Sequence, residues 1–187
     1  MQVKLKNVRL AFPNLFEAKA FEAGGKADFN AAFILPKDHP QVAEIKNAMV
    51  TVAKDKFGAK AKEVYALMEK QDRLALHDGD TKPSLDGYED NLFINARNKV
   101  KPTVVDRNRA PLSAADGKPY AGCYVNVILE FWAQDNQYGK RINASLGGVQ
   151  FYADGDAFSG GRPVDSDAFD DIGADADGAT ADAGEGW

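Results

Sequence analysis

The chain has 187 residues, enough for one domain of ordinary size with an additional tail, and 44% of them are apolar, enough for a core. Its net charge is −5, and no apolar run is long enough to cross a bilayer. A single cysteine, Cys123, excludes an internal disulfide and fits a reducing compartment. The first ten residues alternate charge with apolar side chains, unlike a signal peptide, so we expect a soluble, cytoplasmic protein.

The negative charge is concentrated at the end of the chain. Residues 154–187 contain ten acidic residues and one basic residue, so they carry −9 and leave +4 on residues 1–153. We therefore predict one folded domain over 1–153 and a flexible acidic tail over 154–187. Such asymmetry is typical of a nucleic-acid-binding protein with an internal competitor, or of a domain with a solubilising tail.

In the first half of the chain, alternating apolar and polar residues predict strands over residues 2–12 and 28–35, separated by a loop containing proline and glycine. The apolar period then lengthens to three to five residues, which predicts a helix from Pro40 to Gly58 and another over 59–70. Each helix has one apolar stripe, so we expect both to pack one face onto a sheet.

The second half returns to strand patterns after a polar segment, residues 78–90, which is interpreted as a solvent loop. Strands are predicted over 92–97, 100–106, 122–134 and 142–153, which gives about six strands in total. The fold class is mainly β, an OB-like Greek-key barrel with a helical insert between strands. The OB type carries its helix between the third and fourth strands, and other barrels and α+β sandwiches share the pattern.

Catalytic and metal-binding motifs are scarce. His39 stands at a helix entrance, and His77 stands in the segment HDGD, without a second histidine cluster that could complete a metal site. The chain has no phosphate-binding glycine loop, no nucleophile elbow and no full calcium-loop spacing. We therefore expect no enzyme activity, no metal and no cofactor.

Single-stranded nucleic acid is bound without sequence preference by cations along its backbone and by aromatic faces on which bases stack. Five cations between residues 97 and 109 have one acidic neighbour, Asp106, and three aromatic side chains alternate out of register with the core positions of their strands. The predicted binding residues are Phe93, Arg97, Lys99, Lys101, Arg107, Arg109, Tyr124, Trp132 and Arg141. The alternative is that these rings pack beneath the helical insert.

The acidic tail presents spaced negative charges and a terminal aromatic ring, as a nucleic-acid strand does. We expect it to occupy the basic groove until DNA displaces it, or to present its end to partner proteins. The tail residues in this prediction are Asp167, Phe169, Asp170, Asp171 and Trp187.

Five segments stand in a fixed order along the chain: AFPNLFEAKAFEAG, FNAAFILPKD, NARNKVKPTVVDRN, YAGCYVNVILEFWA and GVQFYADGD. Their order and spacing over residues 1–160 resemble a phage family of single-stranded-DNA-binding proteins. The resemblance implies an OB-fold core and a role in phage DNA replication, recombination or repair in an infected bacterial cell. The tail resembles those through which such proteins contact polymerases and helicases, with Trp187 where phenylalanine is more usual.

The favoured hypothesis is therefore a non-catalytic protein that binds single-stranded DNA, with no membrane contact. A second hypothesis is an interaction or chaperone-like protein that acts through its acidic tail and has no nucleic-acid groove. A nuclease is the third.

Overall fold

The structure, a computed structural model, describes residues 1–20 and 23–158 of the chain. Its strands are β1 (Gln2–Ala20), β2 (Ala27–Pro36), β3 (Leu76–Asp78), β4 (Asn91–Asn98), β5 (Thr103–Val105), β6 (Tyr124–Asn136) and β7 (Gly139–Ala153). Its helices are α1 (Val42–Phe57) and α2 (Ala61–Lys70), with single 3-10 turns at Gly58–Lys60, Gly79–Thr81 and Ala114–Asp116. Both helices were predicted from the sequence, because the apolar residues that form the buried face of each recur at helical spacing.

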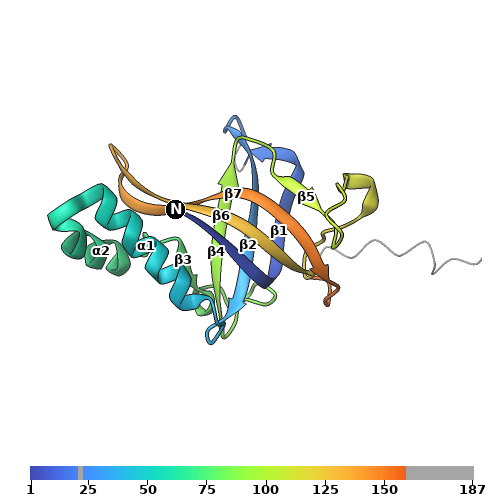
Figure 1. Ribbon diagram of the computed structural model, residues 1–187, viewed down its shortest axis with the longest axis horizontal. Coiled ribbons are helices and arrows are strands. Elements are labelled where there is room, and N and C mark those ends of the chain that lie inside the picture. The colour runs from blue at the N-terminus through green and yellow to red at the C-terminus, as the bar shows by residue number, and fades with distance from the viewer. Residues whose placement is uncertain (21–22, 159–187) are drawn as a thin grey trace, which may run out of the picture.

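Five strands close into a barrel (Figure 1). β1 pairs antiparallel with β2 and β6, β2 pairs with β4, and β6 pairs with β7. A short parallel pairing of β4 with β7, Ala96 opposite Ala144 and Arg97 opposite Ser145, closes the barrel. The OB-like barrel predicted from the sequence is thus confirmed. Its helices follow the second barrel strand, however, and not the third as in the OB type.

One continuous core fills the barrel and extends under the helices. Val125, Val127, Leu129 and Phe131 of β6 are each at most 1% exposed, as the alternation predicts. The buried face of α1, which includes Ile45, belongs to the same cluster. Figure 1 shows both helices at one side of the barrel, near the hairpin that joins β6 to β7. Burying each large apolar side chain contributes roughly 1.5–3 kcal/mol.

β1 is longer than the sequence pattern indicates. We expected a loop after Phe12, but the strand continues to Ala20 through two register shifts in its pairing with β2. Phe12 has a φ of 48°, and Pro13 follows it in the first of these irregularities. A bulge tolerates proline because it needs no ladder hydrogen bond from that residue. The bulge bends β1 and reverses the side-chain alternation beyond it.

The segment between β3 and β4 is not the open solvent loop that its polar composition predicts. Tyr88 is 2% exposed and packs on Phe93, with ring centroids 4.8 Å apart. Burial raises the pKa of Tyr88 to about 12. The segment thereby builds a second, smaller core on the outer surface of the barrel, formed by Ala11, Ala32, Ile34, Tyr88 and Phe93.

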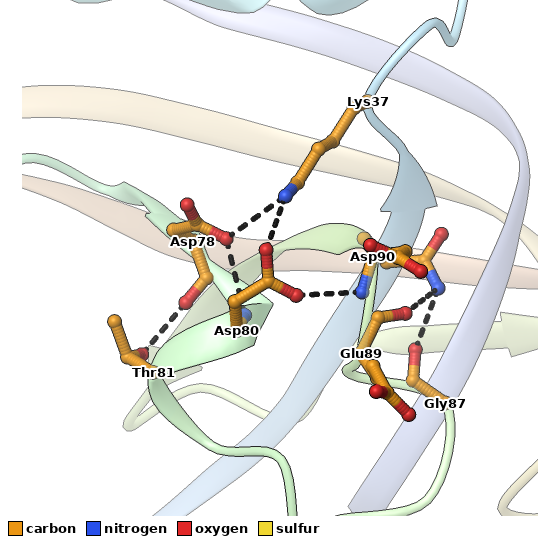
Figure 2. Close-up of polar contacts among 8 residues, drawn as sticks. Lys37, Asp78, Asp80, Thr81, Gly87, Glu89 and Asp90 are labelled. Atoms are coloured by element: carbon orange, nitrogen blue, oxygen red, sulfur yellow. Dashed lines mark hydrogen bonds and ion pairs between the residues drawn. The ribbon is translucent and has the colours of Figure 1, made fainter.

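Charged contacts hold the two ends of this segment together (Figure 2). The Lys37 ammonium lies 3.5 Å from a carboxylate oxygen of Asp78 and donates a hydrogen bond to Asp80. The other carboxylate oxygen of Asp80 accepts the backbone N–H of Asp90 at 2.7 Å. The Lys37 hydrogen bond, followed by that of Asp90, lowers the pKa of the Asp80 carboxyl. The result is a fixed loop, called here the 79–90 loop, over the outer face of β4.

Candidate nucleic-acid interface

A groove of about 650 Å³ crosses the outer face of β1, β2, β4 and β7. The sequence produces it because many outward-facing residues on these strands are short. Its floor contains Ala32 and four asparagines, Asn14, Asn30, Asn95 and Asn143. Within the described residues, α1 and α2 contribute no side chain to the groove lining. The barrel face therefore stays open between the 79–90 loop and the β6–β7 hairpin.

Hydrogen bonds orient three of the floor amides. Asn14 Nδ2 donates to Asn30 Oδ1 at 2.9 Å, and Asn30 Nδ2 donates to the backbone oxygen of Asp28 at 3.1 Å. Asn143 Nδ2 donates to Gln134 Oε1 at 3.2 Å. An amide has two donor hydrogens and an acceptor oxygen, so these side chains can also bind a base edge or a phosphate.

Cations surround the groove. Those that line it or its extension beside Trp132 are Lys19, Lys26, Lys82, Arg97, Lys99 and Arg141. Within the part of the chain that the structure describes, none of these forms an ion pair. One acid, Asp28, lines the groove, and its buried Oδ1 has no hydrogen-bond partner there. The groove therefore presents a positive surface suited to a polyanion.

Two aromatic rings flank the groove. Trp132 is 43% exposed, and its Nε1–H donates to Ser145 Oγ at 3.0 Å, which fixes the indole while leaving much of it open to solvent. Phe12 is 56% exposed and lines the groove from the β1 bulge. Phe12 is not among the binding residues predicted from the sequence. The dipeptide Phe12–Pro13 at the end of a strand was the available signal.

Four of the predicted binding residues line this groove or its extension beside Trp132: Arg97, Trp132 and Arg141 line the groove, and Lys99 lines the extension. Three predicted cations lie beyond it. Lys101 Nζ is 5.9 Å from the ring centroid of Phe16, Arg107 Cζ is 6.0 Å from that of Tyr152, and Arg109 is exposed in the turn after β5.

Two of the three predicted aromatic residues are covered. Phe93 shares the outer face of β4 with Arg97, as expected, but it is 2% exposed beneath the 79–90 loop. Phe93 is therefore packed, as the alternative interpretation expects, but the 79–90 loop covers it and the helices do not. Tyr124 is half-buried, with the Arg9 guanidinium 5.8 Å from its ring centroid.

The predicted tail begins against the barrel. Arg9 Nη2 donates to the backbone oxygen of Asp156 at 2.7 Å, and the Phe158 N–H donates to that of Ala121 at 3.1 Å. The Arg9 guanidinium also lies 4.3 Å from the centroid of the Phe158 ring. The predicted tail residues Asp167, Phe169, Asp170, Asp171 and Trp187 lie outside the described residues.

Both histidines have local hydrogen-bond partners. His39 Nδ1 accepts the Gln41 N–H at 3.1 Å at the entrance to α1, while His77 pairs with Asp72 at 2.8 Å and stacks on Phe93. Residues 1–20 and 23–158 contain no group of His, Cys, Asp and Glu that could hold a metal ion. In the same residues, no helix has the length and hydrophobicity needed to span a membrane.

The fold and the groove together define an OB-type oligonucleotide-binding barrel. OB folds bind oligonucleotides on the face of their second and third strands, here β2 and β4, and with the loops joining strands one to two and four to five. Lys26 lies in the first of these connections and Lys19 at the end of β1 that leads into it, while Trp132 and Arg141 lie on β6 and β7 close to the second. The chain belongs to the family described as Enterobacter phage Enc34, ssDNA-binding protein, which it matches over residues 1–180.

Individual relatives agree with this family. Protein p50 of Acyrthosiphon pisum secondary endosymbiont phage 1 is 46% identical over 175 residues, which cover 92% of this chain and 94% of that one. The single-stranded DNA-binding protein from bacteriophage Enc34, solved in complex with ssDNA, is 31% identical with a TM-score of 0.72, covering 84% of this chain and 89% of that chain. The bacteriophage T7 protein gp2.5 shares the fold, with a TM-score of 0.56 at 14% identity over 90% of this chain and 97% of that chain.

Proposed function

We propose that this protein binds single-stranded DNA without sequence preference in the groove on β1, β2, β4 and β7. It would serve phage DNA replication, recombination or repair in the host cytoplasm, and the proposal contains no catalytic step. The observation that carries it is one groove that holds both the exposed Trp132 and several cations that form no ion pair with any residue the structure describes. Family membership, and the ssDNA in the solved Enc34 complex, support the choice of ligand.

The two kinds of side chain have separate tasks. Arginine and lysine neutralise phosphates and release condensed counterions, which supplies affinity on any sequence. Trp132 and Phe12 offer faces on which bases stack, and every base has such a face. Bases in a duplex are already stacked on one another, so this contribution is available only to a single strand. The arrangement therefore favours single strands without reading their sequence.

Fluorescence anisotropy with labelled single-stranded DNA, duplex DNA and RNA at two salt concentrations tests the proposal. We expect single-stranded DNA to bind more tightly than duplex DNA. Its log affinity should fall with log salt with a slope of about −0.7 for each phosphate contacted. An interaction protein that works only through its tail would bind none of the three nucleic acids. Affinity that does not change with salt would also exclude the groove.

We also propose that the acidic tail competes with DNA for the groove and recruits replication proteins. The charge pattern supports competition, because the tail is acidic and the groove is lined by cations. The likeness of the tail to those of other single-stranded-DNA-binding proteins supports recruitment. Its root at Phe158 is anchored to the barrel through Arg9.

Removal of residues 159–187 is expected to tighten DNA binding and to weaken the preference for single strands. The truncation changes the net charge from −5 to +2 and retains the packed Phe158. A tether can hold the tail at an effective concentration of about 1 mM, so a tail–groove Kd of about 0.1 mM would weaken DNA binding about tenfold. Anisotropy titration of the truncated and full chains at low salt measures the difference.

The matched control is Trp187→Ala in the full chain, which removes the aromatic end and keeps every charge. If this variant binds DNA more tightly than the unmodified protein, the ring itself competes in the groove. If only the truncation has an effect, the tail competes by charge, and the tryptophan serves a partner. Equal affinity of the truncated and full chains would contradict the competition proposal.

A further inference from the structure

The outer face of β7 continues past Ser145, the last β7 residue that lines the groove, as far as Tyr152. From the pairing of Arg97 with Ser145, the chain follows β7 in the same direction, with Thr103 opposite Gly148 and Val105 opposite Gln150. Asn98 Nδ2 donates to the backbone oxygen of Leu146 at 2.9 Å and holds the connecting turn against β7. Residues 97–107 therefore form a border along one side of β7.

This border is basic and the face beside it is open. Its exposed cations are Arg97, Lys99, Lys101 and Arg107. Gly147 and Gly148 interrupt the row of outward side chains on β7 after Ser145; Gly147 is exposed, and Gly148 is buried beside Thr103. Glu130 is the nearby acid on β6, paired with Ser145. A negatively charged strand that leaves the groove thus finds cations on one side and no β7 side chain at the two glycines, with Ile128 of β6, 37% exposed, beside them.

At the far end of this face, β7 presents Tyr152, which is 42% exposed. The Arg107 guanidinium lies 6.0 Å from the centroid of its ring. Gln150 Nε2 donates to the backbone oxygens of Asp106 and Arg107 at 3.3 and 3.4 Å and so secures the loop that carries the arginine. The Asp106 carboxylate accepts two backbone N–H groups at 2.8 Å within its own turn, which partly offsets its charge.

We infer that Tyr152 and Arg107 form a second subsite for single-stranded DNA, in which a base stacks on the tyrosine and the arginine binds a phosphate. The inference rests on the proposed function, because the strand must first occupy the groove. Ser145 and Tyr152 are seven residues apart, which is roughly 20 Å of strand. That distance corresponds to about six stacked nucleotides, and an OB fold covers about 4–16. The two subsites can therefore bind one strand.

Length dependence separates the second subsite from the groove. Anisotropy titrations would use oligo(dT) of about five and about 15 nucleotides, near the two ends of the OB-fold range. Tyr152→Ala should weaken binding of the longer strand at least about fivefold and leave the shorter one unchanged. Tyr152→Phe keeps the stacking face and should bind both as the unmodified protein does. Leu67→Ala, an exposed apolar residue on α2 that does not line the groove, is the control and should change neither.

Arg107→Ala gives a second, independent test, because the exposed guanidinium lies outside the core. It should reduce the salt slope for the longer strand by about 0.7 and leave that of the shorter strand unchanged. Normal binding of the longer strand by both alanine variants would overturn the subsite. Equal losses on both lengths would also overturn it. If Trp132→Ala weakens binding of both strands while Tyr152→Ala weakens binding of neither, the result supports the groove and excludes the second subsite.

Discussion

Replacing Trp132 with alanine is expected to weaken binding of single-stranded DNA by roughly 5- to 150-fold, the effect of one stacked base. The indole lines the groove and is 43% exposed, so the change removes a binding surface and leaves the barrel core intact. The melting temperature should therefore stay within the range of an ordinary surface substitution. Anisotropy gives the affinity, and a thermal melt followed by circular dichroism gives the stability.

Trp132→Phe separates stacking from the hydrogen bond to Ser145. Phenylalanine retains an aromatic face but cannot donate to Ser145 Oγ, as the indole does at 3.0 Å. We expect it to retain most of the affinity. An alanine variant that melts early and binds normally once folded would show that the ring has a structural role instead.

The double substitution Arg97→Ala, Arg141→Ala should have the larger effect. A hydrogen bond to a charged group contributes about 1.5–3 kcal/mol, so loss of two phosphate contacts should weaken binding about 100-fold or more. The salt slope should fall by about 1.4, which is 0.7 for each contact. Both arginines line the groove, and within the described residues neither forms an ion pair.

Lys46→Ala, Lys62→Ala is the matched control for charge, because both lysines are exposed on the helices and neither lines the groove. It removes the same two positive charges from the molecule. Equal losses in the two double variants would mean that affinity follows net charge alone and would contradict a localised site. A loss confined to the arginine pair would assign the phosphate contacts to the groove.

The strands and helices with a regular apolar pattern could be predicted from the sequence, because the spacing of apolar residues indicates which face of an element is buried. The alternation at Val125, Val127, Leu129 and Phe131 predicted β6, and the three-to-five residue spacing predicted α1. The second half of β1 was missed because Pro13 normally marks a loop. Here it lies in a bulge, which depends on the neighbouring strand and not on the local sequence.

The site was only partly accessible for the same physical reason. Trp132 could be found because it is out of register with the core positions of its own strand. Phe93 shows the same signal, yet the 79–90 loop covers it, and loop cover is a tertiary property. Lys19, Lys26 and Lys82 were missed because closure of the barrel brings them to the groove from separate segments.

Mapping where single-stranded DNA contacts the full-length protein tests the central claim most directly. Ultraviolet cross-linking to oligo(dT), followed by mass spectrometry of the linked peptides, reports which aromatic side chains touch a base. We expect cross-links at Trp132 and Phe12, which are lost from each position when that residue becomes alanine. Cross-links confined to α1 and α2, with none at Trp132 or Phe12, would contradict binding in the groove.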